Sequence, residues 1–377
     1  EAGHVFGLKD GNYGEYAYPW DKMNDSLWLK TMGHTPSIMN YTRSSNIPQP
    51  EDNVPSNLLV QKVGPTDKYS IQWAYTEFPR GTTLEEENRA LEQMIRWQDT
   101  VPWYRFSNTI FETLGPSASD EVVETNDPLK STLLGLKNLS RVISLLPKVT
   151  NDQNDNARLE RLYGKTLALW NDHMGHVLTL IGGYDIQYKP LRQSGSLYTP
   201  IAWEKQQEAL DFLLTNAFAP PEWLTRPSFM AKTRYSTFPD QVMQYQQRLL
   251  QEMIMAPRLN RLTYLESRPG NEGVVETYLS RLRLGLFSEL RKEHEALDGR
   301  RQGIQVFFIE QMIKILYQES PGLDKEQRFF AHSDYVKALV MHQLMALKKD
   351  IESCMRKDWD AASSGHWQRC LRKINGI

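Results

Sequence analysis

The 377-residue sequence is poor in three features, and each absence excludes a class of protein. Two cysteines, Cys354 and Cys370, are too few for a disulfide-rich scaffold or a four-cysteine zinc site. The apolar runs are short: VLTLI at 177–181 falls far below the roughly 20 residues of a membrane helix, so we expect no transmembrane segment. The formal net charge is only −2, with 44 basic and 46 acidic residues well mixed, which argues against a nucleic-acid partner.

The composition changes along the chain. Residues 1–80 are rich in Gly, Pro, Asn, Tyr and Trp, with turn signals such as DGNYG, GHTPS and NIPQPEDN, which predict loops and short helices. From Gly81 onward, long amphipathic runs separated by Gly and Pro predict helices. We therefore expect a mainly α fold, with a loop-rich segment at 1–80 and a multi-helix domain at 81–377. The break at 220–240 allows two sub-bundles within that domain.

Helix boundaries are marked by capping residues. Thr82 or Thr83 precedes LEEENRALEQMI, with acidic residues in the first turn. Asp127 precedes a proline at the first helical position, and the pair at Thr199 and Pro200 repeats this order. The later amphipathic runs lie at 240–266, 272–298, 301–318, 333–352 and 356–374. No alternating pattern predicts a strand, and no fixed-period repeat is present.

The first ten residues, EAGHVFGLKD, match most of a zinc-peptidase motif, HExxHxxGxxH/D. On a helix, the two histidines of HExxH face one metal ion, and the Glu between them acts as general base. In that register Glu1 is the base and His4 is the second histidine. Gly7 lets the chain turn out of the helix, and Asp10 returns as an oxygen ligand that zinc accepts. The spacing alone is weak, since long proteins contain similar patterns by chance.

A second pattern follows at the right distance. HTPSIMNYT places Met39 29 residues after Asp10 and has the form of a Met-turn, the tight turn that places a methionine beneath the zinc of metzincin peptidases. Tyr41 comes two residues later. Two partial motifs in the expected order are a much stronger signal than either alone.

Together these motifs resemble the metzincin clan, and the chain is similar to the C-terminal part of the large bacterial zinc-dependent metallopeptidases. YAYPWD, SIMNYTR, VGPTDKYSIQWAY, LGLKNLSRV, LYGKTLALWNDHMGHVLTLIGG and KQQEALDFL carry the likeness in the same order, distinctly over residues 1–225. The resemblance implies Glu1 as general base, His4 and Asp10 as metal ligands, Met39 as the turn methionine and Tyr41 near the metal. It further implies a zinc cofactor, a protein or peptide substrate, and a secreted, periplasmic or cell-envelope parent.

Two departures from the family pattern bear on activity. The chain begins at Glu1, so the first histidine lies outside it, and Asp10 stands where the family usually has a neutral histidine. We expect the full-length parent to hydrolyse peptide bonds with metal-activated water, and this truncated chain to be inactive. The alternatives are a pseudopeptidase or helical module that binds a protein or glycan, and a helical scaffold without a function of its own. The residue encoded just before Glu1 distinguishes them, since a histidine there favours the enzyme.

Several other histidines and acidic residues each allow two interpretations. His173 and His176 are three positions apart on an apolar helix and form either a metal pair or part of the core; the core is the commoner outcome. His34, just before the Met-turn, either helps to shape the site or lies at the surface of the turn, and we expect the surface role. NDQNDN at 151–156 offers oxygen ligands for calcium but lacks the EF-hand pattern, so a helix-capping loop is the better interpretation.

Cysteine and aromatic residues also leave alternatives open. Cys354 and Cys370, 16 positions apart, fit one disulfide within a helical hairpin or two free thiols, and the redox compartment stays open. Trp20, Trp28 and Trp73 lie near the motif in the sequence and either pack against helices or line a substrate groove.

Overall fold

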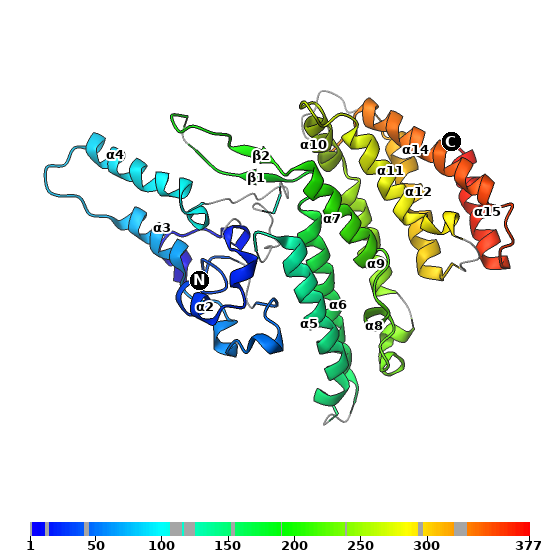
Figure 1. Ribbon diagram of the computed structural model, residues 1–377, viewed down its shortest axis with the longest axis horizontal. Coiled ribbons are helices and arrows are strands. Elements are labelled where there is room, and N and C mark those ends of the chain that lie inside the picture. The colour runs from blue at the N-terminus through cyan, green and yellow to red at the C-terminus, as the bar shows by residue number, and fades with distance from the viewer. Residues whose placement is uncertain are drawn as a thin grey trace. The chain divides into compact units, whose positions relative to one another are not determined.

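The computed structural model describes residues 2–11, 15–40, 45–105, 115–116, 125–151, 155–189, 191–237, 240–292, 297–319 and 330–377. Within these ranges the protein is mainly α-helical, with a single pair of short strands, which confirms the predicted fold class (Figure 1). The chain forms two compact units: unit 1 comprises 1–144 and 172–201, and unit 2 comprises 145–171 and 202–377. The division predicted near residue 80 stays a prediction.

In its described residues, unit 1 contains short helices separated by loops. Its elements are α1 (Ala2–Val5), α2 (Ser26–Met32), α3 (Pro65–Tyr75) and α4 (Leu84–Ile95), the strands β1 (Tyr184–Ile186) and β2 (Tyr198–Pro200), and six 3-10 turns: η1 (Glu15–Ala17), η2 (Trp20–Lys22), η3 (Pro50–Asp52), η4 (Ser56–Leu58), η5 (Arg96–Asp99) and η6 (Pro102–Tyr104). Two longer helices, α5 (Pro128–Val149) and α6 (Ala157–Leu178), contribute residues to both units.

The predicted caps explain where two of these helices begin. Thr83 is the N-cap of α4 and forms a capping box: its hydroxyl accepts from the Glu86 amide at 3.3 Å, and its own amide donates to the Glu86 carboxylate at 2.8 Å. Asp127 precedes Pro128 and accepts from the Lys130 amide at 3.3 Å. Both helix starts are therefore confirmed.

An aromatic cluster forms the core of unit 1. Tyr18, Met23 and Ile47 are buried, and Trp28 and Trp103 pack against them. The rings of Tyr18, Trp28 and Trp103 meet edge to face with centroids 5.5–6.0 Å apart, an arrangement that adds about 0.5–1.5 kcal/mol per pair beyond burial. This cluster joins segments from residues 18 to 103 into one body.

Unit 2 is a helical assembly. Its helices are α7 (Trp203–Asn216), α8 (Glu222–Thr225), α9 (Gln241–Met253), α10 (Ala256–Glu266), α11 (Val274–Leu286), α12 (Gly299–Leu316), α14 (Asp334–Cys354) and α15 (Ala361–Asn375), with 3-10 turns η7 (Met230–Lys232), η8 (Arg234–Ser236) and η9 (Ser288–Arg291). Helices α11, α12, α14 and α15 pack side by side (Figure 1). None of the described helices has the length and apolar content of a membrane span.

Some details differ from the prediction. Thr199 and Pro200 do not begin a helix: they belong to β2, which pairs antiparallel with β1, and α7 begins at Trp203. The sequence pattern did not predict these strands, because a strand of three residues is too short to show an alternation of apolar and polar side chains. The run at 240–266 is two helices, because the break at Ile254 and Met255 precedes a proline in the first turn of α10.

Cys354 and Cys370 are both free and buried, so the two-thiol alternative holds. Burial raises the pKa of the Cys354 thiol, and it raises that of the Cys370 thiol to about 12. A thiol that stays protonated is a poor nucleophile and a poor metal ligand. These cysteines therefore act as small core residues of unit 2.

Candidate functional site

The zinc-motif segment folds as a single helical turn followed by a sharp reversal. Helix α1 ends at Val5, and the amides of Phe6 and Leu8 both donate to the Gly3 carbonyl at 3.0 Å. Gly7 has φ +79°, a left-handed conformation that L-residues rarely adopt, and its Cβ position is open. The glycine is therefore required by the backbone, and it directs the chain back toward α1.

This reversal brings His4 and Asp10 together. The Nε2 atom of His4 lies 3.4 Å from a carboxylate oxygen of Asp10, and both side chains are partly exposed. The Nδ1 atom of His4 lies 2.9 Å from the Leu8 carbonyl. A carbonyl only accepts, so Nδ1 is the donor of this contact, and the neutral tautomer with its proton on Nδ1 has a lone pair on Nε2. A hydrogen bond from the other ring nitrogen is how proteins orient metal-binding histidines.

The distance and donor types of this pair fit zinc. Two ligands bonded to a tetrahedral zinc at about 2.0–2.1 Å lie roughly 3.4 Å from each other, and zinc accepts both imidazole nitrogen and carboxylate oxygen. The described residues contain no group of three His, Cys, Asp or Glu side chains that could hold a metal ion. Glu1 and Tyr41 lie outside the described residues. His4 and Asp10 thus offer two of the ligands that such a site needs.

Met39 packs directly against α1, the helix of the zinc-motif segment. A Cβ atom built on Gly3 would lie 2.1 Å from the Met39 sulfur, so a larger residue at this position would force the Met39 side chain to move. The Met39 carbonyl accepts from the Gly11 amide at 3.4 Å, and the side chain is only 8% exposed. The turn therefore contacts the residue before His4 and the residue after Asp10.

The turn at Ser37–Asn40 is organised by Asp67, a residue that the sequence analysis missed. Its carboxylate is buried and accepts from the Ser37 hydroxyl at 2.6 Å, the Ile38 amide at 3.0 Å and the Gly64 amide at 2.8 Å. Ser37 in turn accepts from the Met39 amide at 2.9 Å. The signal was present in the sequence, because Gly-Pro-Thr-Asp is a helix-start pattern with the acid at the third position.

Two further contacts hold the same turn. The Gln61 side-chain amide donates to the carbonyls of Ser37 and Asn40 at 2.9 and 2.7 Å. The start of α3 lies against the chain before the turn, because a Cβ on Gly64 would sit 2.0 Å from the Pro36 carbonyl oxygen. The N-terminal end of α3 therefore fixes the position of Met39.

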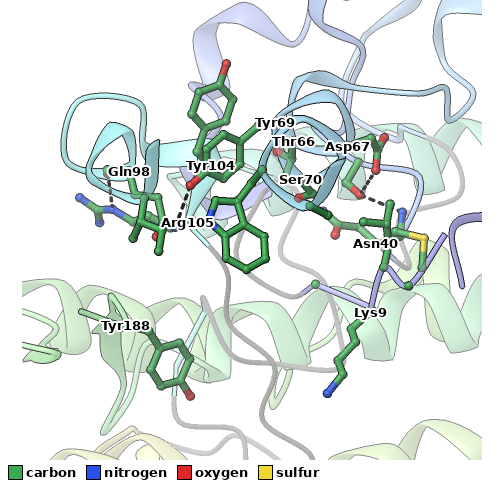
Figure 2. A pocket seen from close by; sticks show the side chains of 18 of the residues that line it. Lys9, Asn40, Thr66, Asp67, Tyr69, Ser70, Gln98, Tyr104, Arg105 and Tyr188 are labelled. Atoms are coloured by element: carbon green, nitrogen blue, oxygen red, sulfur yellow. Dashed lines mark hydrogen bonds between the residues drawn. The ribbon is translucent and has the colours of Figure 1, made fainter. Parts of the chain in front are cut away.

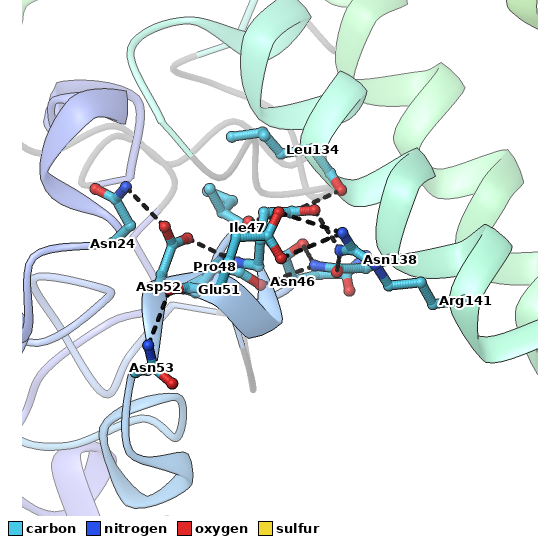
Figure 3. Close-up of polar contacts among 11 residues, drawn as sticks. Asn24, Asn46, Ile47, Pro48, Glu51, Asp52, Asn53, Leu134, Asn138 and Arg141 are labelled. Atoms are coloured by element: carbon cyan, nitrogen blue, oxygen red, sulfur yellow. Dashed lines mark hydrogen bonds and ion pairs between the residues drawn. The ribbon is translucent and has the colours of Figure 1, made fainter. Parts of the chain in front are cut away.

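The segment after the turn is fixed to α5 by a polar network (Figure 3). The Asn138 side chain donates to the Asn46 and Pro48 carbonyls at 2.8 and 3.0 Å. Arg141 donates to the Gln49 side chain and pairs with Glu51 at 3.3 Å. These bonds satisfy a loop that has few backbone partners of its own. Helix α5 thus supports the chain that leads away from Met39.

His173 and His176 are buried core residues of α6. The Nε2 atom of His173 accepts from the Asn46 side chain at 3.0 Å, and Gly135 leaves the room that its ring occupies. Burial lowers the pKa of His173 to about 4 and, with the neighbouring His173, that of His176 to about 3. His34 is also buried, at 2% exposure, so the expected surface role is wrong. The NDQNDN segment lies partly outside the described residues, and its Asp155 accepts from the Ala157 amide at the start of α6.

A hollow of about 550 Å³ adjoins the motif, and we call it the side pocket (Figure 2). Its apolar lining comes from the motif segment, the turn, helices α3 and α4 and the 3-10 turn η6: Phe6, Leu8, Met39, Tyr69, Trp73, Ala74, Ile95 and Tyr104. A volume in this range is typical of ligand sites. The side pocket shares Met39 with the turn, and it shares five residues with the motif segment: Phe6, Gly7, Leu8, Lys9 and Gly11. His4 and Asp10 themselves do not line it.

Of the three tryptophans considered from the sequence, Trp73 lines the side pocket. Trp28 packs in the Tyr18 core cluster, and Trp20 stacks under the Lys130 ammonium at 4.3 Å. The sequence placed all three near the motif, but only packing separates a pocket wall from a core residue.

Comparison with known proteins supplies a family. No curated protein and no solved structure matches the chain. A family model with the description Met-zincin matches residues 1–294, which include the motif segment, the turn and the side pocket. The chain belongs to the Met-zincin family, and with it to a metallopeptidase-like class of domain.

Proposed function

We propose that the full-length protein is a zinc-dependent endopeptidase in which His4 and Asp10 are two of the three protein ligands. The supporting observation is the convergence of the His4 imidazole, the Asp10 carboxylate at 3.4 Å and the Met39 side chain against Gly3. The motif assigns the third ligand to a histidine directly before Glu1. Bound zinc would supply Lewis acidity toward the peptide carbonyl and the attacking water.

The residues of the chain would have separate roles in the hydrolysis. Glu1 would accept the proton of the attacking water and return it to the leaving amine. The Leu8 carbonyl holds His4 in the tautomer that presents Nε2. Asp10 would add a negative charge where the family usually has a neutral histidine, and so reduce the positive charge of the site. Met39 would form the floor and Tyr41 would lie near the metal, as the family resemblance implies.

The side pocket would hold a substrate side chain next to the bond that is cleaved. It is largely apolar and is lined by neighbours of the proposed ligands in the motif segment, so a buried side chain there would position the peptide and displace water. The same resemblance supports a secreted, periplasmic or envelope location for the parent. A protein or peptide substrate follows from this function.

The test uses the full-length protein, with zinc content measured by atomic absorption and hydrolysis measured on a mixed fluorogenic peptide library. Glu1→Gln should keep zinc and lose activity by roughly 10²–10⁴-fold, the usual contribution of a general base. His4→Ala should lose both zinc and activity. The matched control is His342→Ala, an exposed histidine of α14, which should keep both. Zinc retained by His4→Ala, or full activity in Glu1→Gln, would refute the mechanism.

A second candidate, a non-catalytic module that binds peptides, is favoured by the side pocket itself, which needs no metal to be formed. The residue encoded before Glu1 separates the two functions. A histidine there supports the enzyme. Another residue, together with peptide binding but no hydrolysis, supports the binding module.

A further inference from the structure

The β1–β2 hairpin reaches the side pocket from a distant part of the sequence. Its described residues, 184–189 and 191–200, follow α6, yet Tyr188 and Lys189 line the pocket together with residues of the motif segment. Figure 2 shows Tyr188 across the hollow from Tyr69 and Tyr104. The zinc motif and the turn contain neither Tyr188 nor Lys189. The hairpin therefore supplies a wall that these two motifs do not.

One carboxylate fixes the hairpin beside the pocket. Asp99, the last residue of η5, accepts from the Gln187 side-chain amide at 2.9 Å and from that of Gln193 at 2.7 Å. The Lys189 ammonium lies 4.0 Å from the same carboxylate. The preceding residue, Gln98, lines the pocket and donates to the Tyr69 hydroxyl at 3.2 Å. Asp99 thus joins both arms of the hairpin to the wall that holds Tyr69.

Lys189 is held inside the bend of the hairpin. Its ammonium donates to the Ser194 carbonyl at 2.9 Å, and the side chain is 11% exposed. Gly195 has φ +98°, and a Cβ there would lie 2.5 Å from the ammonium nitrogen, so glycine leaves the space that Lys189 fills. A second ion pair, Arg105 with Asp185 at 3.6 Å, ties β1 to the same side of the unit.

The lining favours an uncharged aromatic ligand. Tyr69 and Tyr104 stack with centroids 4.4 Å apart and an interplanar angle of 7°, and Trp73 is 41% exposed beside them. Aromatic faces and edges of this kind attract another ring. The one acid among the described lining residues, Asp67, already accepts from two donors in the turn and from the Gly64 amide.

The charged lining residues oppose a basic ligand. Three cations line the pocket: Lys9, Arg105 and Lys189. Arg105 and Lys189 are already paired, with Asp185 and Asp99 respectively. Among the described lining residues a lysine or arginine side chain would find no unengaged carboxylate, and the juxtaposition of like charges opposes its binding. The charges of the pocket wall therefore disfavour a basic side chain, in addition to the preference of its aromatic residues for a ring.

We propose that the β1–β2 hairpin is a specificity arm: through Tyr188 and Lys189, fixed at Asp99, it restricts the side pocket to an uncharged aromatic side chain and excludes lysine and arginine. The peptide nature of the ligand rests on the proposed function. The hairpin residues are specificity-determining rather than catalytic, since Tyr188 and Lys189 line the pocket rather than the metal-motif pair.

The test measures binding without catalysis, on the chain of residues 1–377. N-acetyl-phenylalaninamide and N-acetyl-lysinamide are titrated into protein carrying ¹⁵N-labelled tryptophan, and the Trp73 indole signal, assigned with Trp73→Phe, reports binding. The phenylalanine probe should shift that signal saturably, and the lysine probe should not. Tyr188→Ala should raise the Kd of the phenylalanine probe at least fivefold. The matched control, Leu191→Ala in the same hairpin, removes a fully exposed side chain and should leave the Kd unchanged.

Asp99→Asn tests the anchor and should raise the Kd at least threefold, with the other indole signals unchanged as evidence of an intact fold. Gln193→Ala, which removes one of the anchoring bonds, is the second variant if Asp99→Asn perturbs folding. An unchanged Kd in Tyr188→Ala, equal binding of the lysine probe, or no shift of Trp73 would each overturn the inference. Hydrolysis by the full-length protein is a separate readout, so a failure of the peptidase proposal leaves the hairpin result standing.

Discussion

Replacing Asp67 should release the turn that positions Met39. The carboxylate is 4% exposed and accepts from the Ser37 hydroxyl and from the amides of Ile38 and Gly64, at 2.6–3.0 Å. In Asp67→Asn, the side-chain oxygen takes the place of Oδ2 toward the two backbone donors, and the NH2 group faces the Ser37 hydroxyl. That hydroxyl then loses the acceptor to which it donates. A buried donor left without a partner costs about 1–3 kcal/mol, and this is the expected loss.

Asp67→Ala leaves all three donors unsatisfied and should cost more than Asp67→Asn. Removing one member of a buried charged network typically costs about 3–5 kcal/mol, a large part of the 5–15 kcal/mol that stabilises an ordinary domain. Because the chain has two units, a single unfolding transition is not assured. The assay is therefore native-state hydrogen exchange at the Ile38 and Met39 amides, which reports the local opening free energy.

The matched control for Asp67 is Asp21→Asn, an exposed aspartate of the same unit, which should change that opening free energy by less than about 0.5 kcal/mol. Equal protection of the Ile38 and Met39 amides in Asp67→Asn and Asp21→Asn would show that the turn does not depend on the carboxylate. A loss of protection spread evenly over unit 1 would show a general effect on the fold instead. Only loss concentrated at the turn supports the reasoning.

Three other outcomes follow from the structure. Gly64→Ala should destabilise unit 1 by at least about 1–3 kcal/mol in chemical denaturation, since its Cβ would lie 2.0 Å from the backbone oxygen of Pro36; an unchanged midpoint would contradict the close approach. Gly175→Ala, where the Cβ meets nothing within 4 Å inside α6, should instead stabilise by about 0.5–1 kcal/mol in the same measurement. Burial lowers the pKa values of His173 and His176 to about 4 and about 3 from 6.5, so the folded state stays neutral while the unfolded state binds protons. The contribution of these histidines to the free energy of unfolding is then complete above pH 6.5 and falls as the pH drops toward 4. In urea unfolding at several pH values, His176→Asn should reduce the slope of the unfolding free energy against pH by up to about 1.4 kcal/mol per pH unit. Equal slopes in the two proteins would refute the assignment.

The sequence predicted those features that depend on local chemistry. Thr83 with Glu86 and Asp127 with its following proline determine helix starts within a few residues of themselves, and the structure has both. The spacing of His4 and Asp10 also predicts proximity, because Gly7 is the residue type that permits the reversal between them. In each case the cause and its effect lie within one or two helical turns.

The sequence did not predict the contacts that depend on distant partners. Asp67 lies 30 residues from Ser37, and the hairpin residue Gln187 lies 88 residues from Asp99. Thr199 with a following proline reads locally as a helix start, but pairing with Asp185 draws Thr199 into a strand. No short-range pattern encodes such a pairing, since its free energy comes from the partner strand and from the side chains that anchor it.

These distant contacts indicate that α5 and α6 do more than pack against the rest of unit 1. A helix that only supported the turn would need apolar packing alone. Asn138 and Arg141 of α5 instead donate hydrogen bonds to the loop that follows the turn, and His173 of α6 accepts one from Asn46. Partly buried polar bonds of this kind favour one register of the contact, because a shift would leave donors unpaired. The loop that leaves Met39 is thereby held at several points by residues more than 80 positions away in the sequence. On this reasoning the positions of His4, Asp10 and Met39 depend on contacts throughout unit 1, and under the proposed function Asn138, Arg141 and His173 would be positioning residues.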